Sequence, residues 1–98
     1  MTNTSSNNFF SHVAQTSDFP LGLEIDYAES CFFYTKDGRR IIDFISGIAV
    51  SSLGHRHPKV VQAIKDQVDK HLHVMVYGEF IQKPQSDFAG LLALQLPD

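Results

Sequence analysis

The chain has 98 residues, of which 43% are hydrophobic and 19% are charged, a balance typical of a folded globular chain with one small domain at most. Its net charge is -3 with histidines neutral, and the basic residues are dispersed, which excludes an electrostatic footprint for nucleic acid or an anionic membrane. Eight Phe and three Tyr are many large rings for so short a chain. We therefore expect some of them to lie on surface that further structure covers.

The start of the chain is polar, and residues 1–8 predict a frayed tail. It has neither a basic flank nor an apolar stretch long enough for a signal peptide or a membrane span, so we expect a cytoplasmic location. The single cysteine, Cys31, cannot form an internal disulfide, which fits a reducing compartment. Because Cys31 lies in an apolar run without a nearby base, we expect a buried structural thiol rather than a nucleophile.

A short amphipathic helix is predicted after the tail, because Phe9, Phe10, Val13 and Ala14 recur at helical spacing. Pro20 should end the helical region, since proline fixes its own φ and favours extended geometry in the residue before it.

Three β-strands are predicted next. Residues 23–29 alternate, with Ile25 and Tyr27 on the face meant for burial, and residues 31–35 and 40–44 are two further β-prone runs. The Asp-Gly pair before Arg39 tolerates positive φ and suits a tight hairpin turn. The expected fold is therefore α+β: a helix, a three-stranded antiparallel meander and then further helices.

The second half of the chain predicts a loop and two helices. Residues 46–54 are apolar but interrupted by small residues, and their spacing favours an ordinary packed loop, although glycine there permits close backbone approach. A helix is expected over residues 57–72, with Pro58 in its first turn. After an irregular stretch around Gly78, Pro84 should open a last helix. Its apolar stripe would consist of Phe88, Leu91, Leu92 and Leu96.

The sequence contains few residues in patterns typical of a metal site or a catalytic site. Four of the five histidines form two His-x-His pairs, but these lie at opposite ends of the predicted helix, about 20 Å apart at its usual rise, so we expect no metal site. We expect His57 to be a polar residue at the helix start and His71 a solvated side chain near its end. The serines lie outside a Gly-x-Ser-x-Gly elbow, and phosphate-binding glycine loops are missing. No lysine lies in an apolar context that would desolvate it.

Three consecutive segments carry a resemblance to a known family. Residues 36–44 read KDGRRIIDF, residues 46–50 read SGIAV and residues 53–58 read LGHRHP, and they are followed by VVQAI at residues 60–64 and HVM at residues 73–75. In this order they resemble the start of the class III pyridoxal-phosphate-dependent aminotransferases, the group that contains ornithine, acetylornithine and 4-aminobutyrate aminotransferases. The likeness extends from about residue 9 to residue 98.

The resemblance implies a fold type I enzyme, a homodimer with active sites at the subunit interface, in which an amino-terminal segment such as this forms part of the small domain. It implies that Ser46 and Gly47 approach the pyridoxal 5'-phosphate cofactor and that Ile48 packs near the amino substrate. By the same resemblance, the further residues on the substrate side are Phe19, His73, Met75 and Tyr77.

The resemblance also implies that the parent protein moves an amino group from an amine or amino acid to a 2-oxo acid. We expect its phosphate cup, its cofactor-pairing aspartate and its Schiff-base lysine to lie beyond residue 98, so residues 1–98 alone should be inactive and free of cofactor. The amino donor stays open. The alternative is a small non-catalytic α+β module that binds another protein through its aromatic surface.

Overall fold

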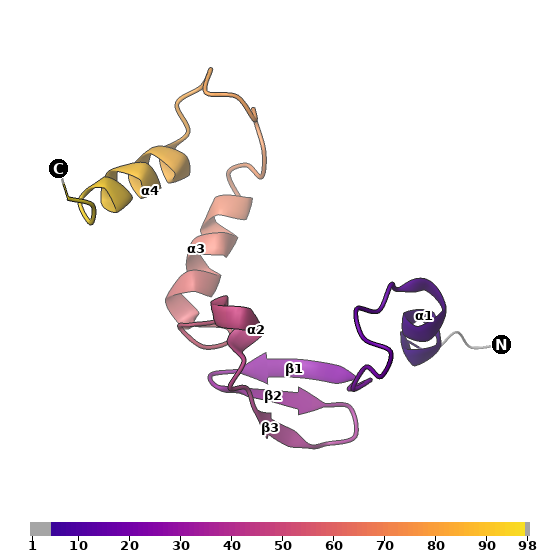
Figure 1. Ribbon diagram of the computed structural model, residues 1–98. Coiled ribbons are helices and arrows are strands. Elements are labelled where there is room, and N and C mark those ends of the chain that lie inside the picture. The colour runs from indigo at the N-terminus through magenta and orange to yellow at the C-terminus, as the bar shows by residue number, and fades with distance from the viewer. Residues whose placement is uncertain (1–4, 98) are drawn as a thin grey trace. The chain divides into compact units, whose positions relative to one another are not determined.

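The computed structural model describes residues 5–97. The chain divides into two units, one that ends at Ile64 and one that begins at Lys65. Figure 1 shows the order of the elements: a helix, three strands and three further helices within the described residues.

The first helix, α1, covers Ser5–His12 and begins inside the segment that the sequence predicted to be a tail. Residues 1–4 lie outside the described residues, but the tail prediction is wrong for residues 5–8, which are helical. The physical reason is a contact with a distant part of the chain, because Ser6 Oγ donates a hydrogen bond to Glu24 Oε1 at 2.6 Å. Local composition carries no signal for such a contact.

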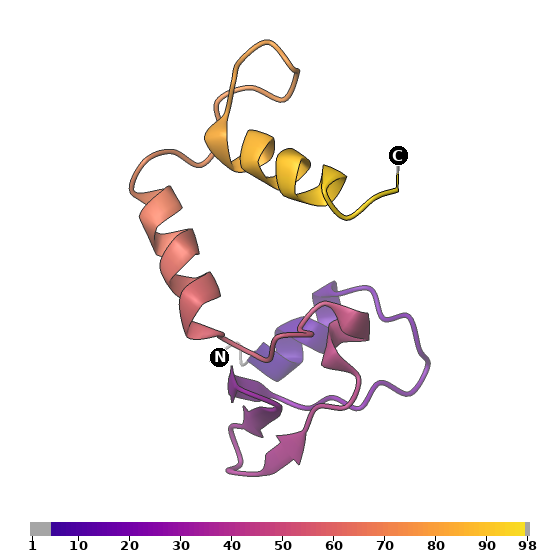
Figure 2. The ribbon, with the colours of Figure 1, turned by 90° about the vertical axis from the view of Figure 1, so that its left-hand side faces the viewer.

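The sheet consists of β1 (Ile25–Glu29), β2 (Phe32–Thr35) and β3 (Arg40–Ile42). The strands lie side by side in the order β1-β2-β3, and both pairs are antiparallel, which confirms the predicted meander (Figure 1 and Figure 2). The predicted face of β1 is wrong, because Ile25 and Tyr27 are exposed whereas Ala28 is half-buried. A register shift between Ile25 and Tyr27 breaks the two-residue period on which that prediction depended.

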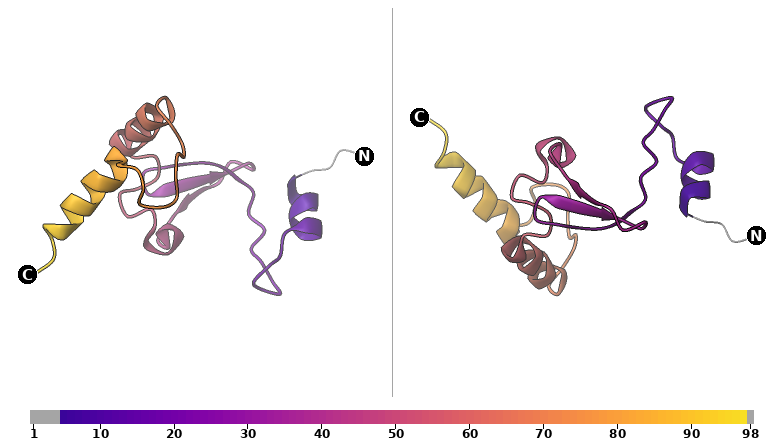
Figure 3. Two further views of the ribbon diagram at one scale, coloured as in Figure 1. Left: turned by 90° about the horizontal axis from the view of Figure 1, so that it is seen from above. Right: turned by 90° about the horizontal axis from the view of Figure 1, so that it is seen from below.

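A four-residue helical turn and a longer helix follow the sheet. The turn α2 (Ser46–Ala49) lies near one end of the sheet and α1 near the other, as Figure 1 and Figure 3 agree. Helix α3 (Pro58–Val68) begins at the predicted proline but ends before residue 72. After Val68 the helical pattern stops, because the Lys70 N–H and the His71 N–H both donate to the Gln67 carbonyl, at 3.0 Å each.

The second unit contains the end of α3, an irregular stretch and the helix α4 (Lys83–Ala93). Pro84 lies in the first turn of α4, as predicted, and Lys83 pairs with Asp87 one turn later at 2.6 Å. Leu96, predicted to complete the apolar stripe, lies beyond the helix.

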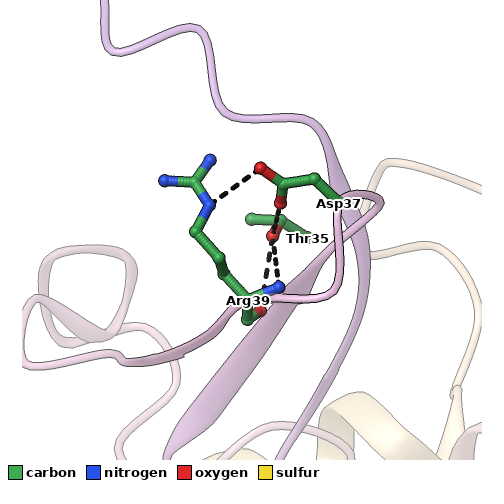
Figure 4. Close-up of polar contacts among 3 residues, drawn as sticks. All are labelled: Thr35, Asp37 and Arg39. Atoms are coloured by element: carbon green, nitrogen blue, oxygen red, sulfur yellow. Dashed lines mark hydrogen bonds and ion pairs between the residues drawn. The ribbon is translucent and has the colours of Figure 1, made fainter.

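The turn between β2 and β3 is held by three side chains (Figure 4). Thr35 is the one buried residue among those described, and its Oγ1 donates to the Asp37 carboxylate and accepts the Arg39 backbone N–H at 3.1 Å. Arg39 Nε donates to Asp37 Oδ2 at 2.9 Å. The hydrogen bond from Arg39, and to a smaller extent the one from Thr35, lowers the pKa of the Asp37 carboxyl. Gly38 has a φ of 84°, which confirms the predicted Asp-Gly turn.

Over residues 5–97, no hydrophobic side chain is buried. The apolar stripe predicted for α4 is exposed, and so are Ile64 and Val68 of α3. Several large rings are exposed too, among them Phe19, Phe44 and Tyr77. Cys31 is exposed as well, which corrects the prediction of a buried thiol: it lies in the turn between β1 and β2 rather than within a strand. In the same part of the chain, no helix has the length and apolar character needed to span a membrane.

We expect residues 1–98, produced as a separate polypeptide, to self-associate, because their apolar side chains have no core to cover them. Light scattering over a concentration series should show an apparent mass that rises with concentration and falls when a mild detergent is added. A monodisperse monomer at every concentration would contradict this expectation.

Candidate functional site

The segment predicted to approach a cofactor forms a left-handed turn. Four successive residues have positive φ: Ser46 at 52°, Gly47 at 60°, Ile48 at 60° and Ala49 at 63°. The Ile48 N–H donates to the Ile45 carbonyl at 2.9 Å and closes the turn. A non-glycine residue in this region costs about 1–2 kcal/mol, and a β-branched residue such as Ile48 is rarely found there. The segment is therefore a strained turn and not the ordinary loop that its spacing favoured.

One carboxylate holds the start of this turn. Asp43 Oδ1 accepts the Ser46 N–H at 2.8 Å, and Asp43 Oδ2 lies 2.7 Å from His55 Nε2. Both side chains are shielded, with 11% of Asp43 and 23% of His55 exposed. The Ser46 amide, and then the His55 imidazole, hold the pKa of the Asp43 carboxyl below its ordinary value of 3.8. Asp43 is therefore an anion at neutral pH that connects β3, the turn and His55.

His55 is itself fixed to the end of β1. Its N–H donates to the Ser30 carbonyl at 2.7 Å, and its carbonyl accepts the Ser30 N–H at 3.1 Å. The approach is close at Gly54, which has a φ of 85° and where an added Cβ would lie 3.1 Å from the Ser30 carbonyl oxygen. Glycine is therefore required here both for its backbone conformation and for its small volume.

The turn presents an apolar surface. Ile48 is 86% exposed, and its neighbours Phe44, Ile45 and Val50 are exposed too. Such a surface can make apolar contact with a ring or an aliphatic chain and can exclude water from one side of it.

Sequence reasoning gave Asp43 and His55 no role in the site. A signal for Asp43 exists, because an aspartate three residues before Ser46 has the spacing of a side chain that accepts a backbone N–H. The pairing with His55, twelve residues further along, has no local signal.

The remaining predicted residues lie in two other places. Phe19 precedes the start of β1 and is 91% exposed, whereas the turn is tied to the end of β1. His73, Met75 and Tyr77 share the irregular stretch of the second unit. There Met75 is half-buried and lines a hollow of about 270 Å³, while Tyr77 is 72% exposed. The structure thus brings Ser46, Gly47 and Ile48 together in one turn. The other three-residue group, His73, Met75 and Tyr77, lies in the second unit.

A larger hollow, of about 540 Å³, lies between α1 and the segment that leads into β1. Its lining is mainly apolar and includes Phe9, Phe10 and Leu21. The residues predicted for the site do not contribute to it, so it is separate from the turn.

The other histidines and the lysines show no catalytic arrangement. His57 Nδ1 accepts the Lys59 N–H at 3.2 Å. His71 is half-buried, and its Nδ1 is buried without a hydrogen-bond partner among the described residues, which corrects the prediction of a solvated side chain. From residue 5 to residue 97, no group of three or more His, Cys, Asp or Glu could hold a metal ion. All five lysines are exposed.

Known proteins resemble this chain over most of its length. The family Aminotransferase class-III matches residues 13–98. An acetylornithine aminotransferase from Methanopyrus kandleri is 37% identical over 86 residues, which are 88% of this chain and 21% of that protein. One from Aquifex aeolicus is 51% identical over 43 residues, 44% of this chain and 11% of that protein.

Solved structures show the same likeness. The taurine:2-oxoglutarate aminotransferase from Bifidobacterium kashiwanohense, in complex with PLP and glutamate, matches with a TM-score of 0.78 and 28% identity over 90% of this chain and 20% of its own. Acetylornithine aminotransferase from Elizabethkingia anophelis matches with a TM-score of 0.72 and 27% identity over 88% of this chain and 22% of its own. The helix, sheet and helices are therefore a fragment of the aminotransferase fold, as predicted, and the chain spans about a fifth of these proteins.

Pyridoxal phosphate needs a reactive amine, an anchor for its phosphate and a group that tunes its ring nitrogen. The turn offers such a group only the exposed apolar side chain of Ile48. The described residues do not supply the amine, because every lysine of the chain is exposed rather than desolvated. No chemical step through the cofactor is assigned to these residues.

Replacing Gly47 should reveal the strain in the turn. In the full native polypeptide that carries these residues, Gly47→Ala should lower the free energy of unfolding by about 1–2 kcal/mol, because alanine is strained at this φ. Lack of space is not the cause, since the added Cβ would lie 3.5 Å from Val50 Cβ. The matched control, Gly90→Ala in α4, meets nothing within 4 Å and should raise stability by about 0.4–1 kcal/mol. Urea unfolding measures both, and effects of equal sign would contradict the expectation.

Acid should reduce the contribution of Asp43 to the free energy of unfolding. Its pKa is lowered in the folded chain, so its stabilising effect is complete above the ordinary value of 3.8 and is lost as the pH falls through the lower folded value. Asp43→Asn should therefore destabilise the protein at neutral pH and lose that effect in strong acid, as urea unfolding at a series of pH values can show. The exposed Asp26→Asn serves as the charge-matched control. A difference from the native protein that stays constant with pH would contradict this sign.

Proposed function

This chain belongs to the class III aminotransferase family, and on that premise we propose that the whole protein transfers an amino group from an amine or amino acid to a 2-oxo acid with pyridoxal phosphate. The observation that carries the proposal is the family match over residues 13–98, nearly the whole chain. The activity is proposed for the whole protein and not for these residues alone, because they span 21% or less of the curated relatives described above.

The role proposed for this segment is to form the substrate side of the pocket. Ser46 and Gly47 would face the cofactor, and Ile48 would contact the apolar part of the amino substrate. Two features support this role: the strained backbone of Ser46–Ala49, since strain of this kind clusters at functional sites, and the exposure of Ile48. The proposal extends to a second group on the substrate side: Phe19, His73, Met75 and Tyr77.

The relatives narrow the substrates to test. The curated relatives described above are acetylornithine aminotransferases, so N-acetylornithine is the first amino donor to try. A structural relative is a taurine:2-oxoglutarate aminotransferase, which makes 2-oxoglutarate the first acceptor. We also propose a homodimer, whose interface would cover exposed apolar side chains, and a cytoplasmic location, in keeping with a single cysteine.

The absence of buried apolar side chains over residues 5–97 also favours a second candidate. A small non-catalytic α+β module could use the same exposed surface to bind another protein. The two candidates differ in whether the native polypeptide has a catalytic lysine and turns over substrate.

The full native polypeptide, supplied with pyridoxal phosphate, N-acetylornithine and 2-oxoglutarate, should form glutamate, with ornithine and taurine as alternative donors. Ile48→Ala should lower kcat/KM for the donor by about tenfold, the lower end of what apolar pocket contacts contribute to discrimination. Lys70→Ala, which truncates an exposed polar side chain in the other unit, is the control and should leave kcat/KM unchanged. A protein that transaminates none of the donors would contradict the proposed function and favour the interaction module.

A further inference from the structure

The left-handed turn needs support from outside itself. Ser46, Ile48 and Ala49 are non-glycine residues at positive φ, and such conformations persist only where the surrounding structure imposes them. Within the turn, the Ile45 carbonyl accepts both the Ile48 N–H at 2.9 Å and the Ala49 N–H at 3.4 Å. Two bonds to one carbonyl close the turn locally but do not set its position relative to the sheet.

Both ends of the loop 43–55 are hydrogen-bonded to the turn between β1 and β2. The Asp43 N–H donates to the Cys31 carbonyl at 2.8 Å, and His55 exchanges two backbone hydrogen bonds with Ser30. Ser30 and Cys31 are adjacent in the turn between β1 and β2, so one point of the sheet fixes the entry and the exit of the loop. Ser30 has a φ of 54°, which shows that this anchor is itself held in an uncommon conformation.

The Asp43 and His55 side chains close the base of the loop. Their Oδ2 and Nε2 atoms lie 2.7 Å apart, and because an ionised carboxylate only accepts, His55 Nε2 carries the proton of this bond. The other Asp43 oxygen reaches into the loop and accepts the Ser46 N–H, the first amide of the strained turn. A continuous series of contacts therefore runs from the end of β1 through His55 and Asp43 to Ser46.

The contact between Asp43 and His55 differs from two ion pairs elsewhere in the described residues. Both side chains of the Asp37–Arg39 pair and of the Lys83–Asp87 pair are more than half exposed, whereas those of Asp43 and His55 are largely shielded. Water competes least with a shielded, charge-assisted hydrogen bond, so of these pairs the one between Asp43 and His55 is best suited to fix the turn relative to the sheet.

We propose that Asp43 and His55 are positioning residues that hold the Ser46–Ala49 turn, and with it Ile48, in place against the amino substrate. This inference rests on the proposed function for its kinetic consequence, but not for its structural one. Neither side chain touches the reacting atoms, and the pair acts through the Ser46 amide.

Hydrogen exchange of the full native polypeptide tests the structural part. Asp43→Ala and His55→Leu should each speed exchange of the amides of residues 46–51 by about tenfold or more, the effect of losing a hydrogen bond to a charged group. His55→Gln should stay close to the native rate, because its amide nitrogen can still donate to the carboxylate. Asp37→Ala, at the other end of β2, is the control that should leave these amides unchanged. Unchanged exchange in Asp43→Ala would overturn the proposal, whatever the activity of the protein.

Kinetics then separates positioning from simple folding. In His55→Leu, KM for the amino donor should rise about tenfold while the absorbance of bound cofactor per protein is kept, and His55→Gln should restore KM. A fall in cofactor absorbance and kcat together at unchanged KM would overturn positioning in favour of a structural role. If Asp43→Ala does not fold, Asp43→Asn, which keeps the Ser46 acceptor, should give an intermediate KM, and a native KM would overturn the proposal. A native polypeptide without transamination would refute the proposed function alone, since exchange would still decide the structural part.

Discussion

Asp43 leaves the sheet where β3 ends, and its two carboxylate oxygens face different partners. One accepts the Ser46 N–H and the other binds His55 Nε2, so a single anion ties a strand end, a strained turn and a distant histidine together. Because Ser30 and Cys31 hold His55 and Asp43 from the other side, the geometry of the candidate site depends on this one cluster of polar contacts. Without it, nothing recorded in the described residues ties the start of the left-handed turn to the sheet.

Polar contacts dominate elsewhere in the described residues too. Thr35 organises the turn between β2 and β3 through Asp37 and Arg39, and Ser6 fastens α1 to the segment before β1 through Glu24. Apolar burial normally supplies most of the stability of a domain, yet no apolar side chain is buried here. The apolar faces of α3 and α4 are therefore surfaces suited to contact with further structure, as in a fragment of a larger fold.

The family assignment and the structure contribute different parts of the functional argument. The match over residues 13–98 assigns the family, and the reaction of the whole protein is proposed from that match. The structure contributes the geometry of a strained backbone turn, whose first amide is bonded to Asp43, and the exposure of Ile48 within it. We therefore propose that the segment positions a substrate and does not supply the group that reacts with it.

The sequence by itself determined what depends on neighbouring residues. Alternating apolar residues, an Asp-Gly pair and two prolines were sufficient for the meander, its tight turn and the starts of α3 and α4. The ordered segments around Gly47 and Gly54 were sufficient for the family. Tertiary structure alone decided the rest: the start of the first helix at Ser5, the exposed Cys31, the shifted register of β1 and the link from Asp43 to His55. Each of these depends on a contact or a register with another segment, which residue spacing along the chain does not encode.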